Sequence, residues 1–201
     1  DGYGGSYGNR IRFLLDSTRA VRKVWPENLP LAVRISAIDW KEDGWQIEDS
    51  IALAKLLKAE GVDLVDCSSG GVVPDAKITV APGYQVPFAE KIRHGAGIAT
   101  AAVGFITEPM QADDIIRNGQ ADVVLLARQM LVDPYWPAHA AKALGCKLTP
   151  PNQYARAWLM ARPHRCAAFF EMLPPMEPTR RAGGRGRNLT PPPVGSVGRP
   201  A

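Results

Sequence analysis

Short apolar runs alternate with amphipathic helical runs along most of the chain. Four times, an apolar run is followed by a segment whose apolar residues recur at three- and four-residue spacing. This order is typical of parallel βα units. The pattern predicts strands over 31–36, 62–67, 98–103 and 122–127, helices over 47–60, 85–94, 109–118 and 133–144, and one earlier helix over 9–24.

The pattern weakens beyond Pro150. We expect residues 151–173 to form a carboxy-terminal arm, and residues 174–201, which are rich in Pro, Gly and Arg, to be disordered. Five Arg and two acidic residues in 171–201 give this end +3 of the formal charge of +4, so residues 1–170 are nearly neutral. A basic tail allows a nucleic-acid-binding hypothesis, but this one has no interleaved aromatic residues, so we expect a solvated tail and no nucleic-acid partner.

The cysteines indicate neither a zinc site nor a disulfide framework. Cys67, Cys146 and Cys166 form no C-x-x-C pair and leave one residue unmatched, which fits a reducing cytoplasm. Cys67 ends an apolar strand with no cation nearby in sequence, so we expect an inert buried thiol. No apolar run approaches the roughly 20 residues that span a bilayer, and no leader pattern opens the chain. A cytoplasmic protein without a membrane partner is expected.

An arginine follows the last predicted strand. Arg128 comes directly after five apolar residues, 123–127. It cannot lie inside the sheet, because an unpaired buried guanidinium costs several kcal/mol or more. The carboxyl end of a strand is where α/β proteins bind ligands, and a helix that begins there offers N–H groups to an anion. Arg128 therefore indicates a phosphate site, with an ordinary surface arginine as the alternative.

Two architectures fit sequential parallel βα units, a doubly wound sheet and a (β/α)₈ barrel. No G-x-G-x-x-G motif follows any predicted strand, which weighs against the first. A barrel usually binds phosphate after strands seven and eight. Gly104 and Arg128 follow the third and fourth predicted strands, so they fit if these strands are numbers five to eight. The predicted fold is therefore α/β, with residues 1–150 forming the carboxy-terminal half of a TIM barrel.

Six segments resemble the old yellow enzyme family, in its thermophilic-like, xenobiotic-reductase branch. They are Asp1-Gly-Tyr-Gly-Gly-Ser6 with Asn9-Arg10, Val33–Ser36, Val65–Gly71, Pro82–Arg93, Ala102–Gly104 and Gln153–Trp158. The resemblance covers residues 1–158 in order and at family spacing. It implies an FMN-dependent ene-reductase in which NAD(P)H reduces the flavin and an activated alkene receives the hydride. It also implies a homo-oligomer for full-length members.

The resemblance implies roles for individual residues as well. Arg34 matches an arginine that sits against the N1/O2 edge of the flavin, with an ion pair inside the barrel as the alternative. Val103 and Gly104 match the segment whose backbone approaches the FMN phosphate, and Arg128 matches the arginine that pairs with it. Ala127 stands where the family usually has glycine. Its methyl group is expected to crowd the phosphate or to force a positive φ.

Arg156 and Trp158 match an arm that reaches into the active site of a neighbouring protomer, with ordinary tail packing as the alternative. The substrate-anchoring His/His or His/Asn pair and the proton-donating tyrosine of the family belong to segments upstream of Asp1. We therefore expect a carboxy-terminal fragment that keeps the phosphate half of the cofactor site and lacks catalysis. The alternative function is a non-enzymatic, phosphate-binding half barrel that self-assembles.

Overall fold

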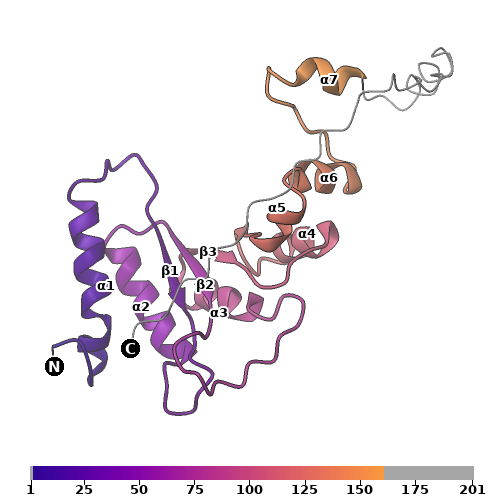
Figure 1. Ribbon diagram of the computed structural model, residues 1–201. Helices are drawn as coiled ribbons and strands as arrows, with labels where there is room; N and C mark the ends of the chain where they lie inside the picture. Colours follow the sequence, from indigo (N-terminus) through magenta and orange to yellow (C-terminus); the bar gives the residue numbers. More distant parts are fainter. Residues whose placement is uncertain (1, 161–201) are drawn as a thin grey trace, which may run out of the picture. The chain divides into compact units, whose positions relative to one another are not determined.

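A computed structural model of the protein describes residues 2–160 (Figure 1). Residues up to Leu148 form one compact unit, and those from Thr149 onward belong to a second. Each unit is described by itself. The predicted disordered segment 174–201, and the arm beyond residue 160, lie outside the described residues.

A four-stranded parallel sheet forms the centre of the first unit. The strands are β1 (Ala32–Ser36), β2 (Leu64–Ser68), β3 (Ala99–Ala102) and β4 (Val123–Val124), and they pair in chain order. A doubly wound sheet reverses its strand order at a switch point. The described strands show no such reversal, and right-handed crossovers in one direction place the connecting helices on the same face.

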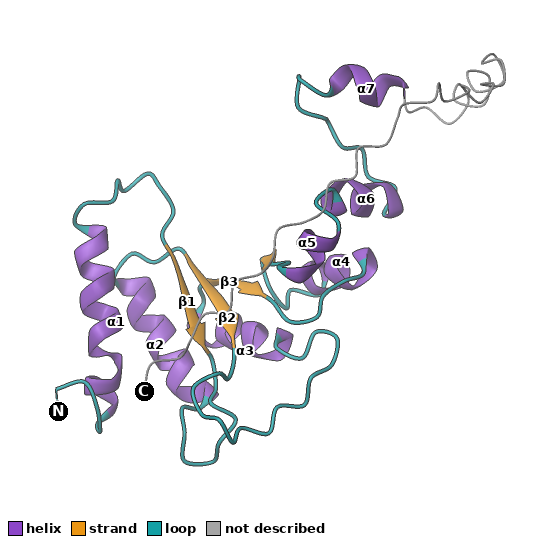
Figure 2. Ribbon diagram, in the orientation of Figure 1, coloured by secondary structure: helices purple, strands orange, loops and turns teal. Residues whose placement is uncertain are grey.

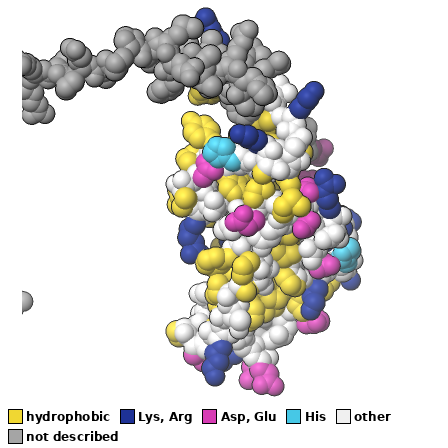
Figure 3. All heavy atoms as spheres, turned by 90° about the vertical axis from the view of Figure 1, so that its right-hand side faces the viewer, with side chains coloured by type: hydrophobic (Ala, Val, Ile, Leu, Met, Phe, Trp, Pro, Cys, Tyr) yellow, Lys and Arg dark blue, Asp and Glu magenta, His cyan; other side chains and the backbone are white. Residues whose placement is uncertain are grey.

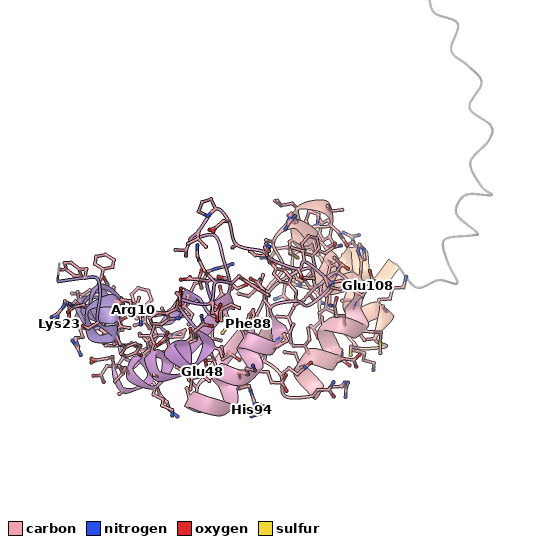
Figure 4. All side chains as sticks on the ribbon, turned by 90° about the horizontal axis from the view of Figure 1, so that it is seen from below. Arg10, Lys23, Glu48, Phe88, His94 and Glu108 are labelled. Atoms are coloured by element: carbon pink, nitrogen blue, oxygen red, sulfur yellow. The ribbon has the colours of Figure 1, made fainter. Side chains whose placement is uncertain are left out.

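The helices of this unit are α1 (Tyr7–Arg22), α2 (Ile47–Ala59), α3 (Val86–Ala96), α4 (Pro109–Arg117), α5 (Arg128–Val132) and α6 (Trp136–Ala143). Helices α2, α3 and α4 lie in a row along one side of the unit (Figure 4), and Figure 2 shows the strands beside them. Helix α1 packs on α2, α2 packs on α3, and α3 packs on β2 and β3, whereas α4 packs beside β4. The second unit contains α7 (Ala155–Met160).

The hydrophobic core lies between the sheet and these helices. Val65 and Cys67 of β2 are fully buried and pack in one cluster with Leu57 of α2 and Ile92 of α3. Because successive side chains of a strand point to opposite faces, Asp66 lies on the face away from the helices. The sheet therefore has one apolar, helix-covered face and one face that carries polar side chains.

The α/β class is confirmed, but two predicted elements are wrong. The strand expected over 122–127 is reduced to β4, and Val123 is 39% exposed rather than buried. Among residues 2–160, strand β4 is last in the sheet order and has a strand neighbour on one side only, so no further strand extends its pairing there. The helix expected over 133–144 begins only at Trp136, because Pro134 lacks an N–H and holds Asp133 in an extended conformation.

The side of the unit that carries α4, α5 and α6 exposes several large apolar side chains. Figure 3 shows this side, on which hydrophobic groups lie among acidic and basic ones. Leu131, Val132 and Tyr135 are 83%, 82% and 71% exposed. None of the described helices is both long enough and apolar enough to cross a bilayer.

Candidate functional site

A cavity of about 440 Å³ opens where the strands end. All four strands, or the loops that follow them, contribute to its lining, which includes Arg34, Ser68, Ser69, Tyr84, Gln85, Val103, Gly104, Phe105, Ala127 and Arg128. Its volume is in the range of roughly 300–1,000 Å³ that is usual for small-molecule sites. The five residues predicted to bind the cofactor thus line one cavity. Their contact with FMN stays a prediction.

Gly104 makes the sharp turn that follows β3. Its φ is +120°, and the next residue, Phe105, also has a positive φ of 49°. A Cβ atom on Gly104 would lie 3.0 Å from Nε2 of Gln85 and 3.1 Å from the ring of Tyr84. The backbone N–H of Gly83 donates to the carbonyl of Gly104 at 2.8 Å. Both the conformation and the close packing therefore require glycine at this position.

Gln85 connects two of the loops that form the cavity. The hydroxyl of Ser69 donates to Oε1 of Gln85 at 2.8 Å, and Nε2 of Gln85 donates to the carbonyl of Val103 at 3.3 Å. Gln85 is 5% exposed, so a buried carboxamide fixes the β2–α3 loop against the β3–α4 turn. Gln85 was not predicted as a site residue, although it lies in the resembling segment Pro82–Arg93.

Arg128 lies on the rim of the cavity, with its guanidinium carbon 4.7 Å from the centroid of the Phe105 ring. Among residues 2–160, no carboxylate lies within ion-pair distance of Arg128. The other arginines of the first unit each have a carboxylate or carbonyl partner, namely Arg10, Arg12, Arg19, Arg22, Arg34, Arg93 and Arg117. The exposed guanidinium of Arg128 is therefore available to an anion in the cavity.

Ala127 precedes Arg128 with φ −97° and ψ −80°. The prediction that alanine would force a positive φ here is wrong, because the φ of Ala127 is negative. The other expectation, that the methyl group crowds a phosphate, stays a prediction. Helix α5 has only five residues, so attraction of an anion must come mainly from the guanidinium rather than from a helix dipole.

Arg34 forms the ion pair that the sequence analysis gave as the alternative to flavin contact. Its Nη1 donates to Oδ2 of Asp66 on the neighbouring strand at 3.1 Å. Burial raises the pKa of Asp66, and the charge of Arg34 opposes that rise. The Arg34 side chain is still 57% exposed, against 14% for Asp66. The pair thus anchors a guanidinium that continues to line the cavity.

The two residues predicted to act between subunits lie in α7 of the second unit. Arg156 is exposed there, and the side chain of Trp158 lies outside those that the structure describes. Their action in a neighbouring active site stays a prediction.

The remaining reactive side chains do not form a second site in the described part of the chain. Cys67 is buried, as predicted, and burial raises the pKa of its thiol to about 12, as expected for an unreactive thiol. His94 lies on the outer side of α3 (Figure 4), and exposed His139 has Nδ1 2.7 Å from Oδ2 of Asp133. Residues 2–160 contain no group of His, Cys, Asp and Glu that could hold a metal ion.

Comparison with known proteins gives a family match over most of the chain. Residues 1–146 match the NADH:flavin oxidoreductase / NADH oxidase family. The NADPH dehydrogenase of Geobacillus sp. (strain WCH70) is 56% identical over 158 residues, which are 79% of this chain and 46% of that protein. The NADPH dehydrogenase of Halalkalibacterium halodurans is 53% identical over 159 residues, with the same coverage. The chain therefore spans about half the length of the curated relatives it matches.

Solved structures show the same backbone arrangement. A complex of 2-naphthoyl-CoA reductase with 2-naphthoyl-CoA superposes with a TM-score of 0.63 at 28% identity, over 73% of this chain and 23% of that one. Histamine dehydrogenase from Rhizobium sp. 4-9 superposes with a TM-score of 0.59 at 23% identity, over 71% of this chain and 21% of that one. The second likeness concerns the fold alone.

Proposed function

Because the chain belongs to the NADH:flavin oxidoreductase / NADH oxidase family, we propose that it supplies the phosphate side of the cofactor site in an FMN-dependent ene-reductase. The predicted membership of the old yellow enzyme family is confirmed, as are FMN as the family's cofactor and NAD(P)H as its reductant. The reduction of activated alkenes, and the part that this chain plays in it, form the proposal.

We assign β1–β4 to strands five to eight of a TIM barrel. Sequential parallel pairing, with helices on one face, is the arrangement that repeats around such a barrel. The usual phosphate site of the barrel lies after strands seven and eight. Gly104 and Arg128 follow β3 and β4, which are strands seven and eight in this assignment. The match to about half the length of the relatives agrees with half of a barrel, whichever half it is.

One observation carries the proposal: Arg128, which has no carboxylate partner among residues 2–160, lines the same cavity as Gly104. A guanidinium can donate two parallel N–H bonds to phosphate oxygens. A glycine with φ +120° lets the backbone approach a ligand without a side chain in the way. The residues present therefore fit the phosphate group of FMN.

Arg34 would lie against the N1/O2 edge of the flavin ring. The chemistry that bound FMN supplies in this family is transfer of hydride from NAD(P)H to a second substrate. A guanidinium held in place by Asp66 stabilises negative charge that develops at that edge. Because Asp66 offsets part of the charge of Arg34, we expect Arg34 to tune the cofactor more than it retains it.

We propose that the 201 residues bind flavin without reducing alkenes. The resemblance assigns substrate anchoring and proton donation to residues that have no match among these 201. General-acid help alone is typically worth about 10²- to 10⁴-fold in rate. Anaerobic assay of the purified chain with FMN, NADPH and 2-cyclohexenone should therefore give turnover near background. Clear flavin-dependent reduction would contradict this part of the proposal.

A self-assembling, phosphate-binding half barrel is the second candidate function. It is favoured by the sheet face that the helices leave uncovered, where Arg34 is exposed and Asp66 has a buried Oδ1 with no hydrogen-bond partner in the described residues. Within the described part of the chain, strands β1 and β4 also each have one neighbour, and such edges invite pairing with another chain. Light scattering that gives the mass of a dimer would support this candidate, and the mass of a monomer would reject it.

Retention of flavin tests the main proposal. After mixing with FMN and gel filtration, the native chain should keep flavin absorbance. Arg128→Ala should weaken binding by roughly 10- to 100-fold, because a charge-assisted hydrogen bond contributes about 1.5–3 kcal/mol. Arg34→Ala should weaken it less. Arg117→Ala removes an exposed arginine that pairs with Asp113 on α4, so it serves as the matched control. Equal retention in the Arg128 and Arg34 variants, or no retention by the native chain, would overturn the proposal.

A further inference from the structure

We propose that Phe105 is a positioning residue that holds the guanidinium of Arg128 in place for the phosphate group of the cofactor. The inference rests on the proposed function, because it concerns the same cavity. It deepens that function by naming the side chain that prepares Arg128 before the anion arrives.

The backbone places the Phe105 ring where Arg128 needs it. Phe105 has a φ of 49°, which non-glycine residues adopt rarely, and it directly follows the turn at Gly104. The turn is fixed from two sides, by the Gly83 N–H on the Gly104 carbonyl and by Gln85 on the Val103 carbonyl. A strained residue on a fixed turn indicates that its side chain direction is determined by its surroundings.

A second aromatic residue supports the ring of Phe105. The ring centroid of Tyr84 lies 6.4 Å away, with an angle of 53° between the ring planes. That distance is within the range of favourable aromatic pairs, roughly 4.5–7 Å. Tyr84 comes from the β2–α3 loop and Phe105 from the β3–α4 loop, whereas Arg128 begins α5. Three separate segments thus form a continuous row of tyrosine, phenylalanine and arginine.

The interaction of Arg128 with Phe105 differs in kind from the ion pairs elsewhere in the unit. A cation 4.7 Å from a ring centroid is attracted by the electron-rich face of the ring. A phenyl ring has no oxygen to accept the N–H groups and carries no charge that cancels the cation. Arg34, by contrast, donates to the carboxylate of Asp66. Phe105 can therefore restrain Arg128 while leaving its positive charge and its donors to an incoming anion.

Restraint before binding should increase affinity for the anion. A free arginine side chain loses rotamer freedom when it engages a phosphate, and a side chain that is already positioned loses less. A leucine at position 105 has no electron-rich face for the cation, whereas a tyrosine keeps one. Leucine and tyrosine also bear the same backbone cost as phenylalanine at φ 49°, which makes the two variants a matched pair.

A binding cycle with two flavins tests the inference. The dissociation constants of FMN and of riboflavin, which lacks the phosphate, are measured by flavin fluorescence for the native 201-residue chain, for Phe105→Leu, Phe105→Tyr and Arg128→Ala, and for the double variant that combines Phe105→Leu with Arg128→Ala. Phe105→Leu should raise the constant for FMN about two- to five-fold and leave that for riboflavin unchanged. Phe105→Tyr should retain native FMN binding. In the Arg128→Ala background, Phe105→Leu should have no further effect.

Several outcomes would overturn the inference. A loss of affinity in Phe105→Leu that is equal for FMN and riboflavin would assign Phe105 to general packing, as would an undiminished effect in the Arg128→Ala background. FMN binding that prefers the phosphate but ignores residue 105 would reject the inference and leave the proposed function standing. A native chain that binds FMN no better than riboflavin would reject both. Circular dichroism of each variant shows whether it is folded. If Phe105→Leu is not folded, Phe105→Tyr decides the inference.

Discussion

The two ends of the four-stranded sheet use arginine differently. At the amino ends of the strands, Arg22 and Arg93 are each joined to an aspartate that also binds the backbone. At the carboxyl ends, Arg128 lies over the ring of Phe105 and has no carboxylate partner among residues 2–160. The contrast separates arginine used to close a structure from arginine held ready for a ligand.

One arrangement occurs twice at the amino ends of the strands. Asp63, just before β2, donates its N–H to the Leu31 carbonyl at 2.9 Å and accepts the Leu31 N–H on Oδ2 at 2.7 Å. Arg22, from the last turn of α1, lies 3.3 Å from the same carboxylate oxygen. A single aspartate thereby joins two neighbouring strands and a helix.

Asp122, just before β4, does the same for β3 and α3. Its N–H donates to the Thr100 carbonyl at 2.9 Å, and its Oδ2 accepts the Thr100 N–H at 2.9 Å. Arg93 adds two parallel bonds, each of 3.0 Å, to the two carboxylate oxygens. In barrel folds the amino-terminal face serves stability and the carboxyl-terminal face serves the active site. Arg22 and Arg93 on the one face, and Arg128 on the other, follow that division.

The largest expected effect is a loss of stability when Asp122 is replaced, and its absence would break the comparison. Asp122→Ala leaves the N–H of Thr100, a fully buried residue, without its acceptor, and such a loss costs about 1–3 kcal/mol. We expect urea unfolding to show a loss of about 2 kcal/mol. Arg128→Ala should change the unfolding free energy by less than about 0.5 kcal/mol, as surface substitutions usually do. Similar losses in the two variants would remove the distinction between the ends.

The pH dependence of stability provides a second test with a defined sign. The hydrogen bonds from Arg93 hold the pKa of Asp122 below its ordinary value. Its contribution is therefore fully present above about pH 4 and is lost as the pH falls through its folded pKa. Asp122→Asn should flatten the acid limb of a plot of unfolding free energy against pH. An unchanged acid limb would mean that the pair with Arg93 contributes nothing.

Asp66 should show the opposite sign. Burial raises its pKa despite Arg34, so its contribution is present below about pH 4 and is lost as the pH rises through its folded pKa. Asp66→Asn should therefore gain stability relative to the native chain as the pH rises through that window. A relative loss over the same window would contradict the assigned sign and show that Arg34 dominates the titration of Asp66.

The smallest expected effect is at Ala127. Its φ of −97° needs no glycine, so Ala127→Gly can act only by removing the methyl group beside the cavity. We expect FMN binding to tighten by less than about two-fold and stability to change by about 0.5 kcal/mol or less. Fluorescence titration checks the first value and urea unfolding the second. A tightening of about ten-fold, which corresponds to roughly 1.4 kcal/mol, would show that the methyl group crowds the phosphate strongly.

Residues with strong local signals were predicted from the sequence. Gly104 and Arg128 stand out because a glycine and an arginine directly after apolar strands need a reason to be there. Gln85 and Phe105 were missed, because an amide and an aromatic side chain look ordinary until the fold brings their loops together. Asp63 and Asp122 were missed as well, because their role depends on hydrogen bonds to neighbouring strands.

Strand β4 was misjudged for a different physical reason. Apolar composition over 122–127 predicts burial only if other strands and a second layer cover the segment. In the described unit β4 lies at an edge, so Val123 is exposed and the pairing ends after Val124. Burial is thus a property of the neighbours as much as of the segment. Likewise, the negative φ of Ala127 could not be deduced from the identity of the residue that the family usually carries there.

The central claim is that Arg128 binds the phosphate of FMN, and phosphorus NMR of the bound cofactor tests it most directly. A guanidinium in contact with the phosphate lowers its second pKa, which is ordinarily about 6. The ³¹P shift of FMN bound to the native chain should therefore stay that of the dianion as the pH is lowered through about 6. In Arg128→Ala, at concentrations that saturate the weaker site, it should titrate close to free FMN. Identical titration of the bound phosphate in the native chain and in Arg128→Ala would contradict the claim.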